Sequence, residues 1–169
     1  MKQQIKKFIP LLTVFFFFGC TGYHLGGSKP EGIKTVYLEP IINKTSESAI
    51  EIQATEALRQ RIQFDGRTTL VNRKELADGV ITVTLSKFTI SAISFRKDLK
   101  TTPKQYRMRI TATTTLTDQH TGKILSKSET YGETVFSYNF DLTTSKRDAL
   151  PAALQELNKF ILDDLIERW

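Results

Sequence analysis

The sequence predicts an α+β domain, a two-layer α/β sandwich in which two helices pack on one face of a mostly antiparallel mixed sheet. Three observations lead to this prediction: a short strand followed by a helical pattern, a long central stretch of period-two alternation, and a C-terminal leucine stripe at helical spacing. Two amphipathic helices can cover one face of such a sheet. The expected element order is β-α-β-β-β(-β)-α, in one domain over residues 33–169.

The first half of this domain contains a short strand, a helix and a second short strand. Residues 34–39 (KTVYLE) are typical of a strand, and the polar residues 43–46 offer caps for a helix over about 46–63. Gly66 ends that helix, and residues 67–71 form the next strand. The helix has apolar residues at helical spacing, namely Ile50, Ala54, Ala57, Leu58 and Ile62.

The second half begins with a meander of longer strands. Residues 80–95 alternate, but the phase of the apolar residues slips after Leu85, which indicates a bulge or bend. Residues 106–117 alternate cleanly, and the more polar residues 124–136 fit an edge strand. The face of the central strand opposite its apolar residues is basic and threonine-rich, and we expect it to meet solvent or a partner; it holds Arg107, Arg109, Thr111, Thr113 and Thr115.

The last element is the clearest helix of the sequence. Ser145 and Asp148 have the spacing of a capping box. Because Pro151 is tolerated only near a helix start, the regular helix is expected to begin around 147–149. Its apolar stripe consists of Leu150, Leu154, Leu157, Ile161 and Leu165.

Residues 1–19 have the pattern of a signal peptide. A basic segment precedes the apolar run Phe8–Phe18, which is shorter than the about 20 residues that span a bilayer. The sole cysteine, Cys20, follows Gly19 where cleavage is expected, as in a bacterial lipobox.

Acylation of Cys20 is therefore the expected modification. The usual lipobox has a leucine and a small residue where this chain has Phe17 and Phe18, so a plain signal peptide with an unmodified cysteine is the alternative. Two or more acyl chains anchor a protein stably. Residues 20–32, rich in glycine, would then form a lipidated tether, and Thr21 is compatible with the outer membrane because it is not the aspartate that retains enterobacterial lipoproteins.

The charge of the chain is concentrated rather than general. The net charge is +6, and residues 87–109 hold seven basic residues against Asp98 alone. Clustered Lys and Arg side chains bind phosphate groups, and lipopolysaccharide is the polyanion of the envelope. A solubilising hairpin that uses charge to protect an edge strand is the alternative. The candidate binding residues are Arg96, Lys97, Lys100, Lys104, Arg107 and Arg109, with Lys146 and Arg147 before the last helix.

The same inventory argues against catalysis and cofactors. His24 lies four residues after Cys20 and His120 lies in a turn, and neither histidine is part of a metal-ligand spacing. No phosphate-cradling glycine loop follows a strand. We expect no enzyme, no metal and no cofactor, and we expect no nucleic-acid partner because the export signal moves the chain away from nucleic acid.

Several motifs taken in order resemble the LPS-assembly lipoprotein family LptE. After Cys20 comes Gly22-Tyr23-His24-Leu25, similar to the family's glycine–aromatic–x–leucine opening. The resemblance continues through KTVYLEP, Asn43-Lys44-Thr45, Phe95-Arg96, Gln105-Tyr106, the DQHTGK turn from Asp118, and Arg147-Asp148-Ala149. It covers residues 20–169, and its element order agrees with the order read from the residues.

The resemblance implies a non-enzymatic outer-membrane lipoprotein at the periplasmic face. Such proteins plug the LptD β-barrel, help it to assemble and assist delivery of lipopolysaccharide to the outer leaflet. By motif position, Arg96 and either Lys146 or Arg147 would contact lipopolysaccharide. The alternative is an envelope lipoprotein that acts as adaptor or regulator of another complex, such as a secretion pore or a peptidoglycan synthase.

Overall fold

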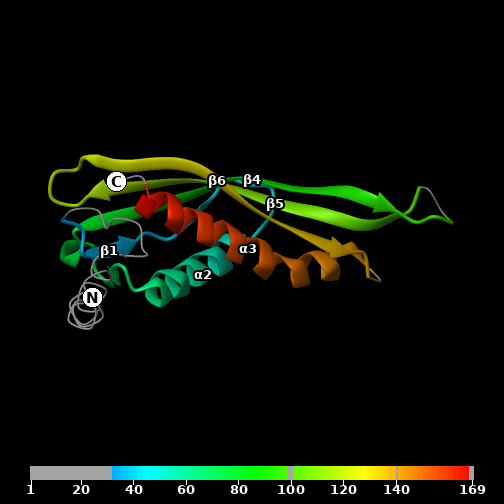
Figure 1. Ribbon diagram of the computed structural model, residues 1–169, viewed down its shortest axis with the longest axis horizontal. Helices are drawn as coiled ribbons and strands as arrows, with labels where there is room; N and C mark the ends of the chain where they lie inside the picture. Colours follow the sequence, from blue (N-terminus) through cyan, green and yellow to red (C-terminus); the bar gives the residue numbers. More distant parts are fainter. Residues whose placement is uncertain (1–31, 99–100, 140, 168–169) are drawn as a thin grey trace, which may run out of the picture.

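The computed structural model describes residues 32–98, 101–139 and 141–167. Residues 1–31 and Lys100 lie outside this part of the chain, so the signal peptide, the acylation of Cys20 and most of the tether remain predictions. Within the described part, the predicted α+β class is confirmed: two long helices lie against one face of an elongated mixed sheet (Figure 1).

The sheet mixes parallel and antiparallel pairs. Its order is β3-β1-β4-β5-β6, and β2 pairs with β4 as well. Strand β1 pairs in parallel with β3 and with β4, and β2 pairs in parallel with β4. The long strands β4, β5 and β6 are antiparallel neighbours. The strands are β1 Thr35–Leu38, β2 Ile42–Asn43, β3 Thr69–Leu70, β4 Gly79–Phe95, β5 Pro103–Asp118 and β6 Ile124–Ser137. As predicted, the polar strand at 124–137 is an edge strand.

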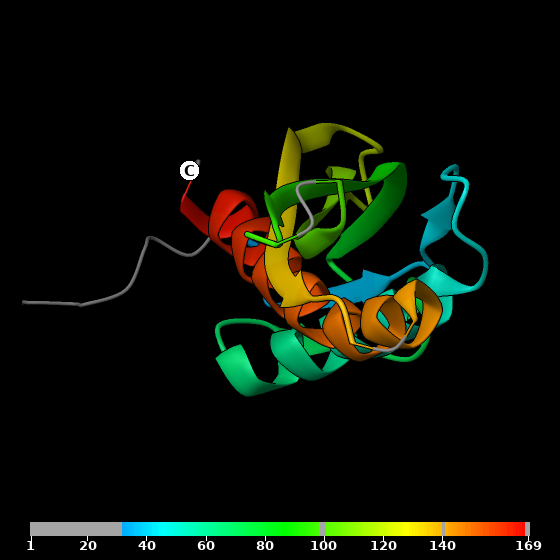
Figure 2. The same ribbon diagram turned by 90° about the vertical axis from the view of Figure 1, so that its right-hand side faces the viewer.

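Two helices form the second layer. These are α2 Ile50–Asp65 and α3 Leu142–Glu167, and both lie on the same side of the sheet (Figure 2). A short 3₁₀ helix, η2 Lys74–Leu76, and strand β2 are further elements that the sequence patterns did not predict. Gly66 ends α2 at φ 69°, and its N–H donates to the Ile62 carbonyl, as the predicted glycine stop requires.

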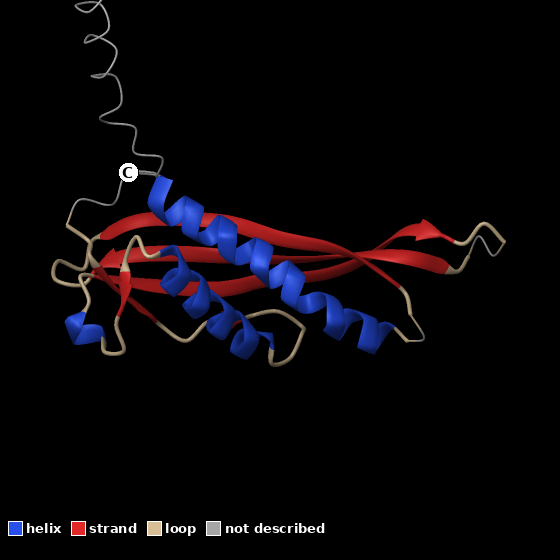
Figure 3. Cartoon of the chain, turned by 60° about the horizontal axis from the view of Figure 1, so that its bottom comes forward, coloured by secondary structure: helices blue, strands red, loops and turns tan. Residues whose placement is uncertain are grey.

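The core fills the space between the helices and the sheet, the two layers that Figure 3 draws. On the sheet, alternate residues are buried from Ile81 to Leu85 in β4 and from Met108 to Leu116 in β5, and the helices contribute residues at helical spacing. Burial of each such side chain contributes about 1.5–3 kcal/mol, so these residues hold the layers together. The sheet supplies Ile81, Val83, Leu85, Met108, Ile110, Ala112 and Leu116, and the helices supply Ala54, Leu58, Ile62, Leu154, Leu157, Ile161 and Leu165.

The predicted start of the first helix at about residue 46 is wrong. Asn43 Oδ1 accepts hydrogen bonds from the Thr45 N–H and hydroxyl, at 2.9 and 2.8 Å, and Thr45 Oγ1 accepts from the Glu47 N–H at 3.2 Å. These side chains therefore stabilise consecutive turns rather than a helix end. The helix begins at Ile50, after Ala49 in the left-handed region at φ 63°.

The predicted start of the last helix at 147–149 is wrong as well. The helix begins at Leu142, and its cap is Asp141, whose Oδ1 accepts from the Thr144 N–H at 2.7 Å. Ser145, the predicted cap, lies inside the helix, where its hydroxyl donates to the Asp141 carbonyl at 2.8 Å. Pro151 is accommodated inside α3 because burial of the neighbouring Leu150 and Leu154 outweighs the lost hydrogen bond.

The long strands extend beyond the helices. The register of β4 against β5 shifts after Leu85 and again after Ala92, which confirms the predicted irregularity. Past the helix ends, β4 and β5 continue as a hairpin (Figure 1). We call residues 91–98 and 101–106 the projecting arm, and the helix-covered remainder the covered half.

Candidate functional site

The projecting arm carries three of the predicted basic residues at its end. The Arg96 N–H donates to the Thr102 carbonyl at 3.0 Å, which closes the hairpin. The Arg96 guanidinium makes a bidentate contact with Asp98, with nitrogen–oxygen distances of 3.1 and 2.6 Å, and this carboxylate raises the pKa of Arg96. Lys97 and Lys104 are exposed and form no salt bridge with any residue that the structure describes.

Exposed apolar side chains lie on the same arm as these cations. Phe95 is 49% exposed and Ile93 41% exposed. Near the base of the arm, the ring of Tyr106 stacks on Phe136 at a centroid distance of 5.7 Å, with Tyr138 at 6.4 Å. Cations beside apolar groups match the chemistry of a phosphorylated lipid, which presents anionic and hydrocarbon parts together.

Arg107 and Arg109 lie apart from the arm's end, on the sheet face opposite α2 and α3. Both reach Glu133 on β6: Arg109 donates to Oε2 at 2.9 and 2.7 Å, and Arg107 lies 3.6 Å from Oε1. The Arg109 guanidinium also lies 4.3 Å from the ring centre of Tyr131. The carboxylate and the ring raise the pKa of Arg109, and a single carboxylate shared by two arginines leaves a net positive charge here.

Lys146 and Arg147 stand in the first turns of α3, beside the start of α2. Lys146 Nζ lies 2.6 Å from Glu47 Oε1, and this ion pair joins the two helix starts. Arg147 is exposed and lies 3.7 Å from Asp148. The pair borders a groove of about 240 Å³ whose apolar lining includes Ile50, Phe88 and Leu150.

The structure therefore divides the predicted binding residues into three groups. Arg96, Lys97 and Lys104 lie on the arm, Arg107 and Arg109 on the outer sheet face, and Lys146 and Arg147 at the helix starts. Both helices begin toward the end of the sheet from which the arm projects (Figure 3). Phe88 on β4, in the groove between the helix starts, faces the same layer as the stacked Tyr106 and Phe136.

The sheet face opposite the helices is lined by threonines, as predicted. Thr111, Thr113 and Thr115 alternate with the buried residues of β5, and they are partly exposed. Their cross-strand neighbours on β4 include Thr84 and Thr82. The part of this face formed by these residues of β4 and β5 presents hydroxyl groups.

The sequence interpretation did not single out Asn158. This residue lies in α3 beside Leu157, and only 1% of it is exposed. Neither polar atom of its side-chain amide has a hydrogen-bond partner in the described part of the protein. The available signal was a polar residue at a helical position next to the leucine stripe, where burial is expected.

Two further properties hold for the described residues. Over residues 32–98, 101–139 and 141–167, no group of three or more His, Cys, Asp or Glu side chains is arranged to hold a metal ion. Over the same ranges, no helix has the length and apolar character needed to cross a membrane.

The fold is that of several bacterial lipoproteins of known structure. The chain is similar to rare lipoprotein B from Shewanella oneidensis, with a TM-score of 0.52, 12% identity and coverage of 78% of this chain and 93% of the other. For an uncharacterised lipoprotein B from Nitrosomonas europaea the TM-score is 0.53 at 13% identity, with coverage of 89% of this chain and 90% of the other. For a hypothetical protein from Chlamydia trachomatis the TM-score is 0.58 at 11% identity, with coverage of 78% of this chain and 95% of the other. At these identities the likeness concerns the fold alone.

The sequence also matches a protein-family model. The model described as "LptE: Lipopolysaccharide-assembly" matches residues 33–169, and the chain belongs to this family. Among curated proteins, no sequence matches significantly. The family is one of non-enzymatic lipoproteins of lipopolysaccharide assembly, which agrees with the resemblance noted in the sequence.

Proposed function

We propose that this protein is a lipid-anchored outer-membrane lipoprotein that plugs the LptD β-barrel and helps it to assemble. In this role it assists insertion of lipopolysaccharide into the outer leaflet. The observation that carries the proposal is the family match over residues 33–169. Cys20 is the proposed site of lipid attachment, with the protein on the periplasmic face of the membrane.

The threonine face supports the plug role. A barrel lumen is polar and wet, so a plug should offer hydrogen-bonding side chains to it. The hydroxyl groups of Thr111, Thr113 and Thr115 meet this requirement, and the Arg107–Arg109–Glu133 cluster adds charged groups on the same face.

The arm and the helix starts are the proposed contacts for lipopolysaccharide. On the arm, Lys97 and Lys104 have no carboxylate partner among the described residues, and Phe95 beside them is exposed. At the helix starts, Lys146 and Arg147 border an apolar groove. Both places combine a cation with an apolar surface, whereas Arg107 and Arg109 are already paired with Glu133.

Co-purification with the barrel tests the plug role. Tagged full-length protein, coexpressed with LptD and extracted from outer membranes in detergent, is expected to bring the barrel with it in a stable complex. A Cys20→Ser variant reports on the anchor and is expected to lose labelling by a radioactive fatty acid. Recovery of the wild-type protein alone, or with a secretion-pore or peptidoglycan-synthase complex instead, would contradict the proposal.

Charge reversal tests the lipid contacts separately. A triple variant of the arm (Arg96→Glu, Lys97→Glu, Lys104→Glu) is expected to bind lipopolysaccharide at least about tenfold more weakly, because charge-assisted contacts to phosphate are lost. The matched control reverses three exposed cations elsewhere (Arg73→Glu, Lys123→Glu, Lys127→Glu), which gives the same net charge. Equal lipopolysaccharide binding by the two variants would show that the arm is not a lipid contact, and it would leave the proposed plug role unaffected.

A further inference from the structure

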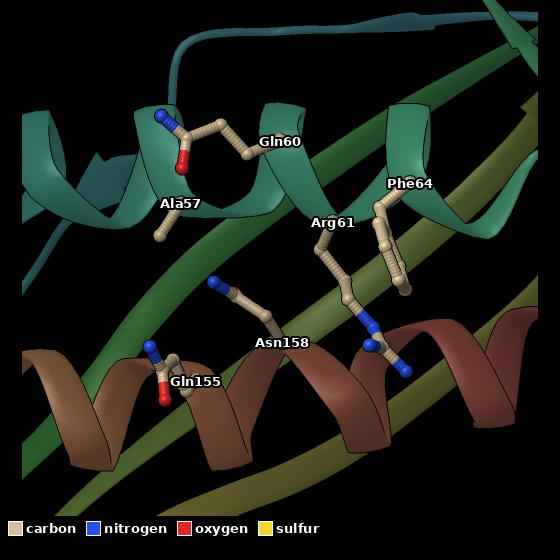
Figure 4. Close-up of a pocket in the computed structure, with 6 residues that line it drawn as sticks. All are labelled: Ala57, Gln60, Arg61, Phe64, Gln155 and Asn158. Atoms are coloured by element: carbon tan, nitrogen blue, oxygen red, sulfur yellow. The ribbon is translucent and has the colours of Figure 1, made fainter.

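A groove of about 320 Å³ runs between the two helices, away from the candidate lipid contacts. It is lined from α2 by Ala57, Gln60, Arg61 and Phe64, and from α3 by Gln155 and Asn158. In Figure 4, Arg61 and Phe64 reach from α2 toward α3, Asn158 reaches from α3 toward α2, and the strands pass behind both helices.

Asn158 is the unusual residue of this groove. It is 1% exposed, yet its amide nitrogen and its amide oxygen both lack a hydrogen-bond partner within the described part of the protein. A buried polar group without a partner destabilises the fold, and an apolar residue of similar size would avoid this cost. An amide in this position suits a groove whose ligand supplies the missing hydrogen bonds.

Arg61 adds a second unsatisfied group. Its Nε atom is buried and has no partner among the described residues. The nearby carboxylate of Asp65 is held by Arg67, which donates to it from Nε at 2.5 Å and from Nη2 at 2.7 Å. The Asp65 carboxylate is therefore already paired with Arg67, and the Arg61 guanidinium can donate hydrogen bonds to a further anionic partner.

These groups select one kind of ligand. The Asn158 amide offers an NH₂ donor group and an oxygen acceptor side by side, which a peptide bond complements, whereas a phosphate or carboxylate offers acceptors only and would leave the Asn158 oxygen unpaired. Arg61 matches a carboxylate. Phe64, which is 85% exposed, adds an apolar wall that a polypeptide side chain can cover.

We propose that this groove binds an extended polypeptide segment whose backbone hydrogen-bonds to Asn158 and whose acidic side chain meets Arg61. The inference rests on the proposed function, because the partner that we assign is a segment of the β-barrel. The groove thus becomes a contact between barrel and helices, separate from the threonine face and from the lipid contacts.

Photocrosslinking tests the groove in the intact complex. p-Benzoyl-phenylalanine replaces Phe64 in one full-length variant and Ile52, exposed on α2 outside the groove, in another. Both are coexpressed with the barrel and irradiated in outer membranes. The Phe64 adduct is expected to map to a barrel segment that contains Asp or Glu. A Phe64 adduct confined to lipid, or mapping to a segment without acidic residues, would overturn the proposal.

Asn158→Leu then separates binding from structure. We expect it to raise the melting temperature of the protein, and to lower the yield of the Phe64 adduct at least about fivefold while the Ile52 adduct is unchanged. The control Gln63→Leu, an amide-to-leucine change on α2 outside the groove, should leave both adducts unchanged.

The two proposals fail differently. If the barrel co-purifies but Asn158→Leu leaves the Phe64 adduct intact, or lowers both adducts equally, the groove inference is wrong and the proposed function stands. If the barrel does not co-purify with the wild-type protein, the proposed function fails, and the groove loses the partner assigned to it.

Discussion

Strands β4 and β5 run through both the covered half and the projecting arm, but the helices α2 and α3 pack on them only in the covered half. In the covered half, β4 and β5 place Leu85 and Ala112 opposite each other, and both are fully buried under the helices. In the arm, the same two strands place Ala92 opposite Tyr106, where one is exposed and the other half-buried. The strands themselves continue, and only the helical layer stops.

The difference separates stability from recognition. Buried apolar area is concentrated where the helices lie, so the covered half supplies the folding free energy. The arm buries little, and it exposes Phe95 and Lys97, the latter without a salt bridge to any described residue, so both can meet a ligand. The predictions below test this division.

The largest expected effect is the loss of a core side chain. Ile110→Ala should destabilise the protein by about 2–5 kcal/mol, because Ile110 is fully buried and its removal leaves a cavity. Phe95→Ala on the arm should change stability by less than about 0.5 kcal/mol. Urea unfolding of the full chain in detergent, followed by circular dichroism, measures both. Similar losses at the two positions would show that the arm is part of the stabilising core.

Next comes Gly132→Ala in β6. A Cβ atom at Gly132 would meet the backbone of α3, at the Ala153 oxygen and the Leu157 nitrogen, and would lie 2.7 Å from the Leu157 Cα. Since neither backbone can move without shifting the helix, we expect a loss of about 3 kcal/mol.

Gly122→Ala is the control for this glycine. Gly122 has φ 70° in open space, so an alanine there meets only the strain of the left-handed region, about 1 kcal/mol. Equal losses in urea unfolding would mean that α3 can move away from β6, and that the covered half is less tightly packed than its geometry indicates.

A smaller effect concerns the entry to β4. Asp78 Oδ2 accepts hydrogen bonds from the Lys34 N–H at 2.9 Å, the Thr35 N–H at 2.8 Å and the Thr35 hydroxyl at 2.9 Å. The backbone N–H groups of Thr35 and Lys34 lower the pKa of Asp78. A carboxyl group with a lowered pKa in the folded state stabilises the protein above its unfolded pKa of about 4, and this contribution is lost as the pH falls through the folded pKa.

Asp78→Asn should therefore cost about 1–2 kcal/mol at pH 7 and flatten the fall in stability below about pH 4. Urea unfolding at pH 7 and at pH 3 measures this change. Asp148→Asn is the control, because Asp148 is exposed on α3 and none of these backbone N–H groups binds it. A pH profile of Asp78→Asn that parallels the wild type would show that other carboxylates cause the acid sensitivity.

The sequence predicted the covered half well because burial imposes periodicity. The alternation of residues 106–117, the slip of phase after Leu85 and the helical spacing in both helices all record which side chains face the other layer. Helix starts were predicted poorly, since polar residues such as Thr45 and Ser145 can stabilise turns or lie inside a helix, and only the tertiary packing decides between these uses.

The candidate site was only partly predictable for the same reason. Composition identified the basic residues, but ion pairs form across elements that are distant in sequence. Lys146 meets Glu47, and Arg109 meets Glu133, and neither pairing follows from spacing. Asn158 could have been predicted to line a groove only from knowledge that α2 lies beside it. The arm was predicted as a basic stretch between two long strands, but its extension past the helices was not predicted.

The smallest expected effect on stability sharpens the boundary between the two regions. Glu133→Gln should change stability by less than about 1 kcal/mol, since its ion pairs with Arg107 and Arg109 are partly exposed. It should nevertheless strengthen lipopolysaccharide binding, because two guanidinium groups at the base of the arm lose their carboxylate. Glu129→Gln is the matched control, with the same change of charge on the same face of β6 and no salt bridge to any described residue. If both variants bind lipopolysaccharide equally, net charge alone governs binding, and the position of the charge relative to the arm does not matter. If only Glu133→Gln binds more tightly, the Glu133 carboxylate is what keeps Arg107 and Arg109 in a structural role and out of lipid binding.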